Sequence, residues 1–197
     1  MRVALLGDVH CRMKRVREAI EINKPVLQLG DFGDYQTWSE VQHMSQDDLM
    51  VVGGNHDNYE MYYDSPVALG DFGLVPGCKS TFFIRGALSI DPERRMFGRD
   101  WWPNEELSIM QMEKMLDEYE RIKPEVVVSH DGPVSATQKM FGVYMESRTS
   151  GYLDLAYQIY QPKQWFFGHH HTSKKVKLGR TKFRCLTIDE LVIEDLP

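Results

Sequence analysis

The chain has few cysteines and no long apolar run. Cys11, Cys78 and Cys185 are odd in number, far apart and in no C-x-x-C pair, which excludes a disulfide framework and a cysteine-based zinc finger. No apolar run approaches the ~20 residues that span a bilayer, and Gly7 and Asp8 interrupt the apolar start too early for a signal peptide. We therefore expect a cytoplasmic protein that makes no membrane contact.

An excess of positive charge is also absent. The net charge is -6, which argues against a partner such as duplex nucleic acid. One basic run departs from this balance, and two interpretations stay open for it: the solvated face of a two-stranded hairpin, or a basic rim that attracts an anionic substrate. The run consists of Lys174, Lys175, Lys177, Arg180, Lys182 and Arg184.

Repeats, low-complexity stretches and linkers are absent, and 197 residues suit one domain, so we predict a single domain over residues 1–197. Short apolar runs, typical of strands buried on both faces, alternate with stretches of helical periodicity. The runs are Val3–Leu6, Val26–Leu29, Leu49–Val52, Glu125–Val128 and Trp165–Phe167. Residues 67–90 and 174–196 read as further short strands. The sequence thus predicts an α/β fold with two mixed sheets inside and helices outside, a four-layer αββα sandwich.

The helical periodicity is clearest in two places. Met13, Val16 and Ile20 recur at helical spacing in the first. In the second, an apolar stripe from Ile109 to Tyr119 follows Ser108 and Gln111, which are placed like a capping box.

Polar side chains follow five of the apolar runs directly, in the stretches "GDVH", "GDFGD", "GGNHD", "SHDG" and "GHHH". These stretches contain six of the 7 histidines of the chain; only His43 lies elsewhere. In open α/β sheets the carboxyl ends of the strands form the edge where ligands bind. A single such stretch is an ordinary turn, but five of them in register predict one shared site.

The side chains gathered there are imidazoles, carboxylates and one carboxamide, without a thiolate. This mixture suits Mn, Fe, Zn, Co or Ni better than a lone Ca or Mg ion. The number of ligands exceeds what one ion needs. Two ions about 3.5–4 Å apart form a known clamp for in-line displacement at phosphorus.

Together these motifs resemble the calcineurin-like metallophosphoesterase superfamily. Its pattern is Asp-x-His, Gly-Asp-x-x-Asp, Gly-Asn-His-Asp/Glu, a strand-ending His, and Gly-His-x-His, and the five stretches match it in order over nearly the whole chain. The segment "SIDPERRMFGRDWWPNEELS" is similar to one found in small single-domain members from phages and bacteria. A phage origin would place the protein in the host cytoplasm.

The resemblance implies a role for each motif residue. Asp8, His10 and His171 would hold one metal ion, Asn55, His130 and His169 the other, and Asp31 would bridge them. His56 would be the general acid, with Asp34 orienting its ring. The implied activity is hydrolysis of phosphodiester or phosphomonoester bonds by a hydroxide held between two divalent transition-metal ions, Mn before Fe, Zn, Ni or Co.

The "GHHH" stretch raises the question of how neighbouring histidines share two ions. On an extended segment, His169 and His171 would face one side and reach different ions, whereas His170 would point to the opposite face. We therefore expect His170 to be no ligand.

The sequence departs from the family pattern at two places. Cys11 stands where many members have Gly, and we expect it to be a small buried filler. Tyr35 and Gln36 stand where protein phosphatases have Arg-Gly, so the phosphate-gripping arginine is missing. Substitute cations are Arg12, Arg99 and Arg148. Trp101 and Trp102 would form an aromatic lip over the site or else pack in the core.

These departures favour a small phosphate-ester substrate that is nucleotide-like, and they predict that phosphodiesters are hydrolysed at least as well as monoesters. A serine/threonine phosphoprotein phosphatase on the same fold is an alternative. A non-catalytic metal-binding scaffold is a further one, which the complete ligand set and the presence of His56 disfavour. The oligomeric state, pathway and native substrate do not follow from the sequence.

Overall fold

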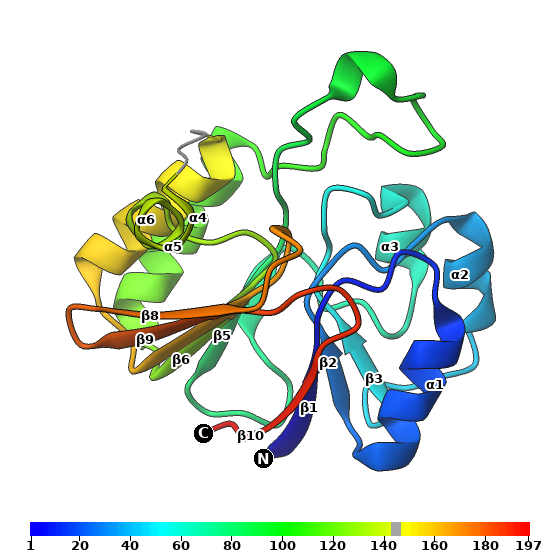
Figure 1. The fold of residues 1–197 in the computed structure, drawn as a ribbon, viewed down its shortest axis with the longest axis horizontal. Helices are drawn as coiled ribbons and strands as arrows, with labels where there is room; N and C mark the ends of the chain where they lie inside the picture. Colours follow the sequence, from blue (N-terminus) through cyan, green and yellow to red (C-terminus); the bar gives the residue numbers. More distant parts are fainter. Residues whose placement is uncertain (143–146) are drawn as a thin grey trace.

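Two β-sheets pack face to face between two layers of helices in the computed structural model, which describes residues 1–142 and 147–197 (Figure 1). The first sheet has four strands in the order β10-β1-β2-β3, and the second has six in the order β4-β5-β6-β7-β9-β8. This is the αββα sandwich that the sequence predicts. Both sheets are mixed: β10 is antiparallel to β1, β4 to β5 and β8 to β9, whereas the central strands are parallel.

The first sheet and its helices come mainly from the first third of the chain. Its strands are β1 (Arg2–Leu6), β2 (Val26–Gln28), β3 (Leu49–Val51) and β10 (Leu191–Asp195). The helices on its outer face are α1 (Met13–Ile22), α2 (Tyr35–Glu40) and α3 (Tyr59–Asp64).

The second sheet and its helices follow in the chain. Its strands are β4 (Phe72–Leu74), β5 (Thr81–Ile84), β6 (Val126–Ser129), β7 (Gln164–Phe167), β8 (Lys174–Leu178) and β9 (Thr181–Cys185). Its helices are α4 (Ile109–Ile122), α5 (Val134–Phe141) and α6 (Arg148–Ile159), and the short 3-10 helix η1 (Pro92–Arg94) lies in the loop between β5 and α4.

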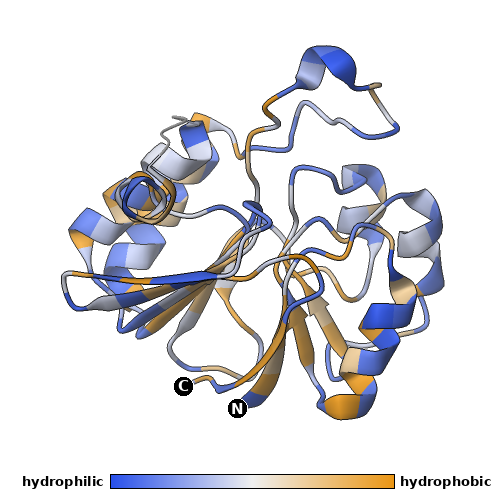
Figure 2. Cartoon of the chain, viewed as in Figure 1, coloured by the Kyte–Doolittle hydropathy of each residue, from blue (hydrophilic) through white to orange (hydrophobic). Residues whose placement is uncertain are grey.

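The layers follow from the period of two along each strand. In β1, Val3 and Leu5 pack between the sheets, whereas Ala4 and Leu6 pack against the helices of the first sheet. Burying a large aliphatic side chain contributes about 1.5–3 kcal/mol, so strands that are apolar on both faces are held in the interior. Figure 2 shows the same division, with apolar strands inside and polar outer helix surfaces.

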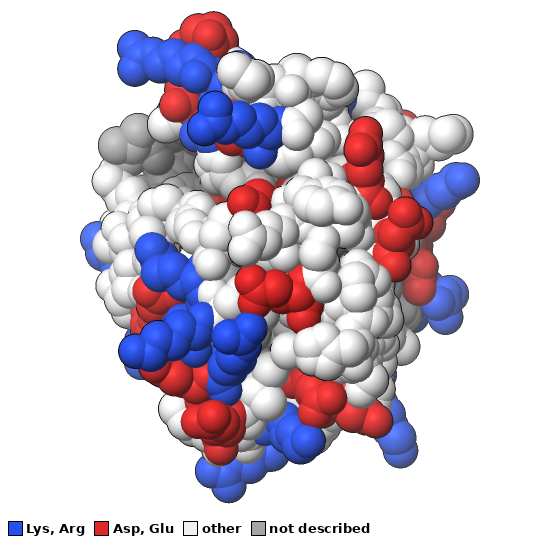
Figure 3. Space-filling model, turned by 90° about the vertical axis from the view of Figure 1, so that its right-hand side faces the viewer, with Lys and Arg blue, Asp and Glu red and all other residues white. Residues whose placement is uncertain are grey.

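Local signals in the sequence mark where elements begin. The capping box at Ser108 and Gln111 is formed, and α4 starts at the next residue after Ser108. The basic run forms the antiparallel hairpin of β8 and β9, whose Lys175, Lys177 and Lys182 are exposed. Arg184 pairs with Glu190 at 2.9 Å. On the described part of the face drawn in Figure 3, acidic and basic side chains are interspersed.

The prediction of an extended "GHHH" segment is wrong. His169 and His171 both adopt left-handed backbone conformations, with φ of 63° and 49°. The segment turns because the His169 backbone N–H donates to Asp8 Oδ1 at 3.2 Å and Thr187 Oγ1 donates to the His171 carbonyl at 2.8 Å. Among the described residues, no helix is both long and apolar enough to cross a membrane.

Candidate metal centre

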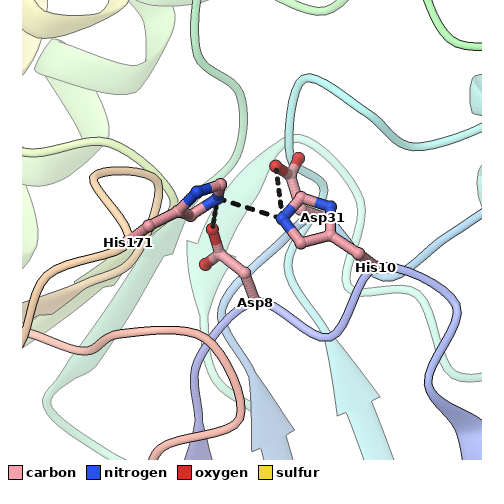
Figure 4. Close-up of side chains that lie close together, drawn as sticks. All are labelled: Asp8, His10, Asp31 and His171. Carbon is pink, nitrogen blue, oxygen red and sulfur yellow. Dashed lines mark hydrogen bonds and ion pairs between the residues drawn. The ribbon is translucent and has the colours of Figure 1, made fainter.

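One group of ligand-type side chains lies where β1, β2 and β7 end. Asp8, His10, Asp31 and His171 each offer a ligand atom, and these atoms all lie within 4.8 Å of one another (Figure 4). His171 Nε2 is 3.1 Å from Asp8 Oδ2 and 3.0 Å from His10 Nε2. Both carboxylates are buried, whereas the two imidazoles are partly open to solvent. We call Asp8, His10 and His171 the first ligand group.

A second group lies beside it, at the ends of β3, β6 and β7. His130 Nε2 is 3.1 Å from Asn55 Oδ1, and the His130 and His169 ring centroids are 5.1 Å apart. His130 Nδ1 lies 2.7 Å from the Leu29 carbonyl, which fixes the proton on Nδ1 and leaves the Nε2 lone pair free for a ligand. We call Asn55, His130 and His169 the second ligand group.

Asp31 stands between the two groups. Its Oδ1 lies 3.3 Å from His130 Nε2, and its Oδ2 lies 3.9 Å from His10 Nε2. The backbone N–H of His56 donates to Oδ1 at 2.9 Å and holds the carboxylate in place. One oxygen of Asp31 therefore faces each ligand group.

The backbone at the site is strained. Asp31 has a φ of 56°, and His10 and Cys11 have φ of 42° and 69°. Left-handed conformations at residues other than glycine cost roughly 1–2 kcal/mol each and persist where surrounding contacts fix them. Cys11 is exposed, so its predicted role as a buried filler is wrong.

The carboxylates change the proton affinity of the imidazoles. Burial alone would lower the pKa of His130, but the Asp31 carboxylate outweighs it and raises the pKa to about 10. The adjacent Asp8 carboxylate raises the pKa of His171, whereas burial lowers the pKa of His169 to about 4. Burial opposes ionisation of Asp31, yet the neighbouring His130 lowers the pKa of its carboxyl group. The carboxylates thus create a negative field in a water-poor space, which favours bound positive charge.

The residues present fit divalent metal ions. Asp8 Oδ2 is buried and makes no hydrogen bond of good geometry in the part of the chain that the structure describes. The backbone also leaves room only for glycine beside the ligands: a Cβ on Gly54 would lie 2.4 Å from Asp31 Oδ1 and 2.9 Å from His130 Nε2. An unsatisfied buried carboxylate oxygen, free imidazole nitrogens and oxygen donors match transition-metal coordination.

His56 lies at the rim of this centre, with its ring centroid 5.7 Å from that of His10. We expected Asp34 to orient the His56 ring. Both residues are described by the structure, and it shows no hydrogen bond between them. Asp34 instead caps α2, accepting from the Thr37 backbone N–H at 3.0 Å and its hydroxyl at 2.9 Å. His56 Nδ1 lies 2.6 Å from Arg95 Nη1.

Four of the five expected substrate contacts have other partners in the structure. Arg12 pairs with Asp189 at 2.8 Å and Arg148 with Glu106 at 3.5 Å, while Arg99 is exposed. Trp102 is buried in the core between the first sheet and its helices, so it cannot form a lip. Trp101 packs edge-on against Phe97, with 6.4 Å between centroids. Their bulk is used for packing, which the sequence interpretation had left open.

Three residues at the centre were given no role by the sequence interpretation. Asp57 accepts from the backbone N–H groups of Phe32, Gly33 and Gly54 at 2.7–2.9 Å, joining two ligand loops. Ser89 accepts from Asn55 Nδ2 at 3.1 Å and donates to Glu105 at 2.6 Å. Asp57 follows the ligand motif directly, whereas Ser89 and Glu105 are isolated polar residues in a loop.

A cavity of about 370 Å³ opens over the centre. Its lining includes Asp31, Asn55, His56 and His169 on one side and residues of α5 and α6 on the other. His170 lines it too, but its ring stacks on Phe141 and its Nε2 lies 3.1 Å from Asp131 Oδ1. The Nε2 of His170 thus contacts a carboxylate that belongs to neither ligand group.

The family follows from the sequence match. A family model for calcineurin-like phosphoesterases matches residues 1–173, so the chain belongs to the calcineurin-like phosphoesterase family. Proteins of this superfamily are in general metal-dependent hydrolases, and the candidate metal cluster agrees with that class. No protein of curated function matched the sequence.

Solved structures show the same fold at low identity. A Thermus thermophilus protein has a TM-score of 0.59 at 9% identity, with 98% of each chain covered. A Mycobacterium tuberculosis phosphopantetheinyl hydrolase has a TM-score of 0.51 at 11% identity, covering 95% of this chain and 90% of that one. A putative 5'-nucleotidase from Staphylococcus aureus has a TM-score of 0.57 at 14% identity, covering 96% of this chain but 49% of its own length.

Proposed function

We propose that the protein is a binuclear metal-dependent phosphoesterase that hydrolyses phosphate esters of small, nucleotide-like molecules. The observation that carries the proposal is the position of Asp31, whose two oxygens face two different ligand groups. Asp8, His10 and His171 would hold one ion, Asn55, His130 and His169 the other, and Asp31 would contact both. Mn(II) is our first choice for a site of imidazoles and oxygens, ahead of Fe, Zn, Ni and Co.

Ions bound there would supply Lewis acidity, which would offset the charge on the phosphate and lower the pKa of a water molecule. The oxygen of the attacking water bonds to phosphorus, and the bond from phosphorus to the leaving oxygen breaks with its electron pair on that oxygen. In the substrate complex, with a proton on Nδ1 in place of its contact with Arg95 Nη1, His56 then gives the leaving oxygen a proton from Nε2. The water releases one proton to solvent, and His56 takes one back.

Metal content and hydrolysis in the Asp31→Asn variant test this proposal. We expect the wild-type protein to bind two equivalents of Mn(II), measured by elemental analysis after gel filtration, and to hydrolyse nitrophenyl phosphate or bis-nitrophenyl phosphate. Asp31→Asn should retain at most one equivalent and lose turnover, because a carboxamide offers only one oxygen to two ions.

Asp47→Asn is the matched control, since Asp47 is an exposed aspartate outside the site. It should keep both the metal content and the turnover of the wild type. Saturation of the wild-type protein by one equivalent, or full occupancy in Asp31→Asn, would contradict a binuclear site.

A further inference from the structure

The fixed cation that the sequence lacks after Asp34 is present elsewhere in the fold. Tyr35, at the position of the missing arginine, is exposed at the start of α2. The loop between β5 and α4, residues 85–108, rises above the strand-end edge of both sheets (top of Figure 1) and carries Arg95. Arg95 lines the cavity together with Asp31, Asn55 and His56. Among the described residues of the lining, it is the only lysine or arginine.

The guanidinium of Arg95 is held in a defined direction. Its Nε and Nη2 both lie 2.6 Å from Asp91 Oδ1, four residues earlier in the same loop. This leaves Nη1 to reach the site, where it lies 2.6 Å from His56 Nδ1. Arg95 is mostly covered, with 20% of its side chain exposed. Arg94, the residue next to it, instead extends into water with 81% of its side chain exposed.

The partner of Nη1 in the structure is a weak one for an arginine. A guanidinium is only a donor, so His56 must offer it the lone pair of a neutral ring nitrogen. An anionic phosphoryl oxygen is a stronger acceptor, because hydrogen bonds with charge on both partners are about twice as strong as neutral ones. A phosphate oxygen that enters beside His56 would therefore replace His56 Nδ1 as the acceptor of the hydrogen bond from Arg95 Nη1.

We infer that Arg95 binds a non-bridging phosphoryl oxygen of the substrate and that the site consequently favours phosphomonoesters over phosphodiesters. This inference rests on the proposed phosphoesterase function and names the substrate class for it. A monoester dianion has one more charged oxygen than a diester, and Arg95 is the cation placed to receive it. The expectation that phosphodiesters are hydrolysed at least as well as monoesters rested on the absence of such a cation, and we replace it with this proposal.

The inference is tested by comparing Arg95→Gln with the wild type, using nitrophenyl phosphate as the monoester and bis-nitrophenyl phosphate as the diester. For the wild type, kcat/KM should be higher for the monoester. Loss of one charge-assisted hydrogen bond should lower kcat/KM of the variant for the monoester by roughly 10- to 100-fold. The diester should change less than about threefold, because it lacks the oxygen charge that Arg95 matches.

Inorganic phosphate provides a readout that does not depend on turnover. Titration calorimetry on the Mn(II)-loaded protein should show phosphate binding that is weaker by roughly 10-fold or more in Arg95→Gln. Arg95→Lys should recover part of this binding, since it keeps the charge but loses the planar fork. Arg94→Gln is the matched control on the adjacent exposed residue and should leave every measurement unchanged.

The outcomes separate the two proposals. If Arg95→Gln binds phosphate as tightly as the wild type, or loses monoester and diester hydrolysis equally, the inference about Arg95 is wrong while the phosphoesterase function stands. If the wild-type protein binds no metal and hydrolyses neither ester with any divalent ion, the proposed function itself fails. Metal content and Tm of each variant, equal to those of the wild type, show that any loss arises at the phosphate contact.

Discussion

At the scale of single residues, His56 separates metal binding from proton transfer. Its backbone N–H holds Asp31, whereas its ring lies at the cavity and contacts Arg95. The backbone of His56 thus positions Asp31, and its side chain is the proposed acid. A change of the side chain can therefore remove the acid without loosening the carboxylate between the ligand groups.

We predict that His56→Ala retains both metal ions and loses turnover by about 10²- to 10⁴-fold for esters with poor leaving groups. The loss should be smaller for nitrophenyl esters, because nitrophenolate leaves without a proton. Kinetics with an alkyl and a nitrophenyl ester, together with metal analysis, check this. His43→Ala, a change of an exposed histidine outside the site, is the control. Loss of metal from His56→Ala would show instead that the imidazole is a ligand.

The residues differ in how far the sequence could assign them. Asp31 and His130 follow buried strands, so their meeting could be predicted from the order of the motifs alone. The partner of His56 could not be predicted, because Asp34 is also well placed to cap α2. Its local hydrogen bond with Thr37 forms instead of one with the His56 ring. Arg95 was missed because its loop has no periodicity that would reveal which side chain turns inward.

At the scale of elements, the loops after β1, β2 and β3 determine the site more than the strands do. Strand ends only bring the loops near one another. Close backbone approach then sets the distances between ligands, and Gly54 is one point where two loops come close together. A Cβ there would lie 2.2 Å from the Asp31 backbone nitrogen, a contact that cannot form without movement of the loop.

Gly54→Ala should therefore weaken both folding and metal binding. We expect a loss of roughly 1–3 kcal/mol in the free energy of unfolding, measured by urea denaturation, as for other overpacked sites. Metal occupancy should fall in the same variant, because the displaced neighbours are Asp31 and His130.

Gly151→Ala supplies the contrast. Gly151 lies within α6, and a Cβ there meets no atom within 4 Å. Alanine in a helix should leave stability unchanged or raise it by up to about 1 kcal/mol. Equal stabilities of the two variants would refute the role of close packing at Gly54.

The strands and helices were the most predictable elements, for a physical reason. Apolar runs of five or fewer residues and a formed capping box at Ser108 are local properties, and the structure places β1, β2, β3, β6, β7 and α4 at the expected positions to within a residue or two. The turn at His169 to His171 was not predictable, since its conformation depends on Asp8, more than a hundred residues earlier.

At the scale of the whole molecule, the two ligand groups join the two sheets. Asp8, Asp31 and Asn55 follow strands of the first sheet, whereas His130, His169 and His171 follow strands of the second. A bound ion would thus add a further connection between the two sheets, which already meet at this edge through the contact of His130 with the Leu29 carbonyl and the hydrogen bond from the His169 N–H to Asp8. Unfolding must separate these ligands, so metal binding should stabilise the native state.

Metal removal should accordingly lower the melting temperature. Binding at about 100 times the dissociation constant contributes about 2.7 kcal/mol, which corresponds to roughly 5–10 °C for a chain of this length. Calorimetric scans with Mn(II), and after treatment with EDTA and removal of the chelator, measure the difference. The shift should be largely lost in Asp31→Asn and retained in Asp47→Asn. Identical melting of the metal-loaded and metal-free wild type would argue against ions that bridge the sheets.

The hydrogen bonds between Ser89 and Glu105 have a consequence for how the β5–α4 loop can change over evolution. They fasten the two ends of the loop together directly beside Asn55, with the Ser89 backbone N–H and hydroxyl donating to the two Glu105 oxygens at 2.9 and 2.6 Å. Once the ends are fixed, extra residues between them cost little, since doubling the length of a flexible loop adds only about 0.6 kcal/mol of closure entropy. Insertions and deletions between residues 90 and 104 can therefore reshape the cover of the cavity, and with it the choice of substrate, while Asn55 keeps its place in the second ligand group.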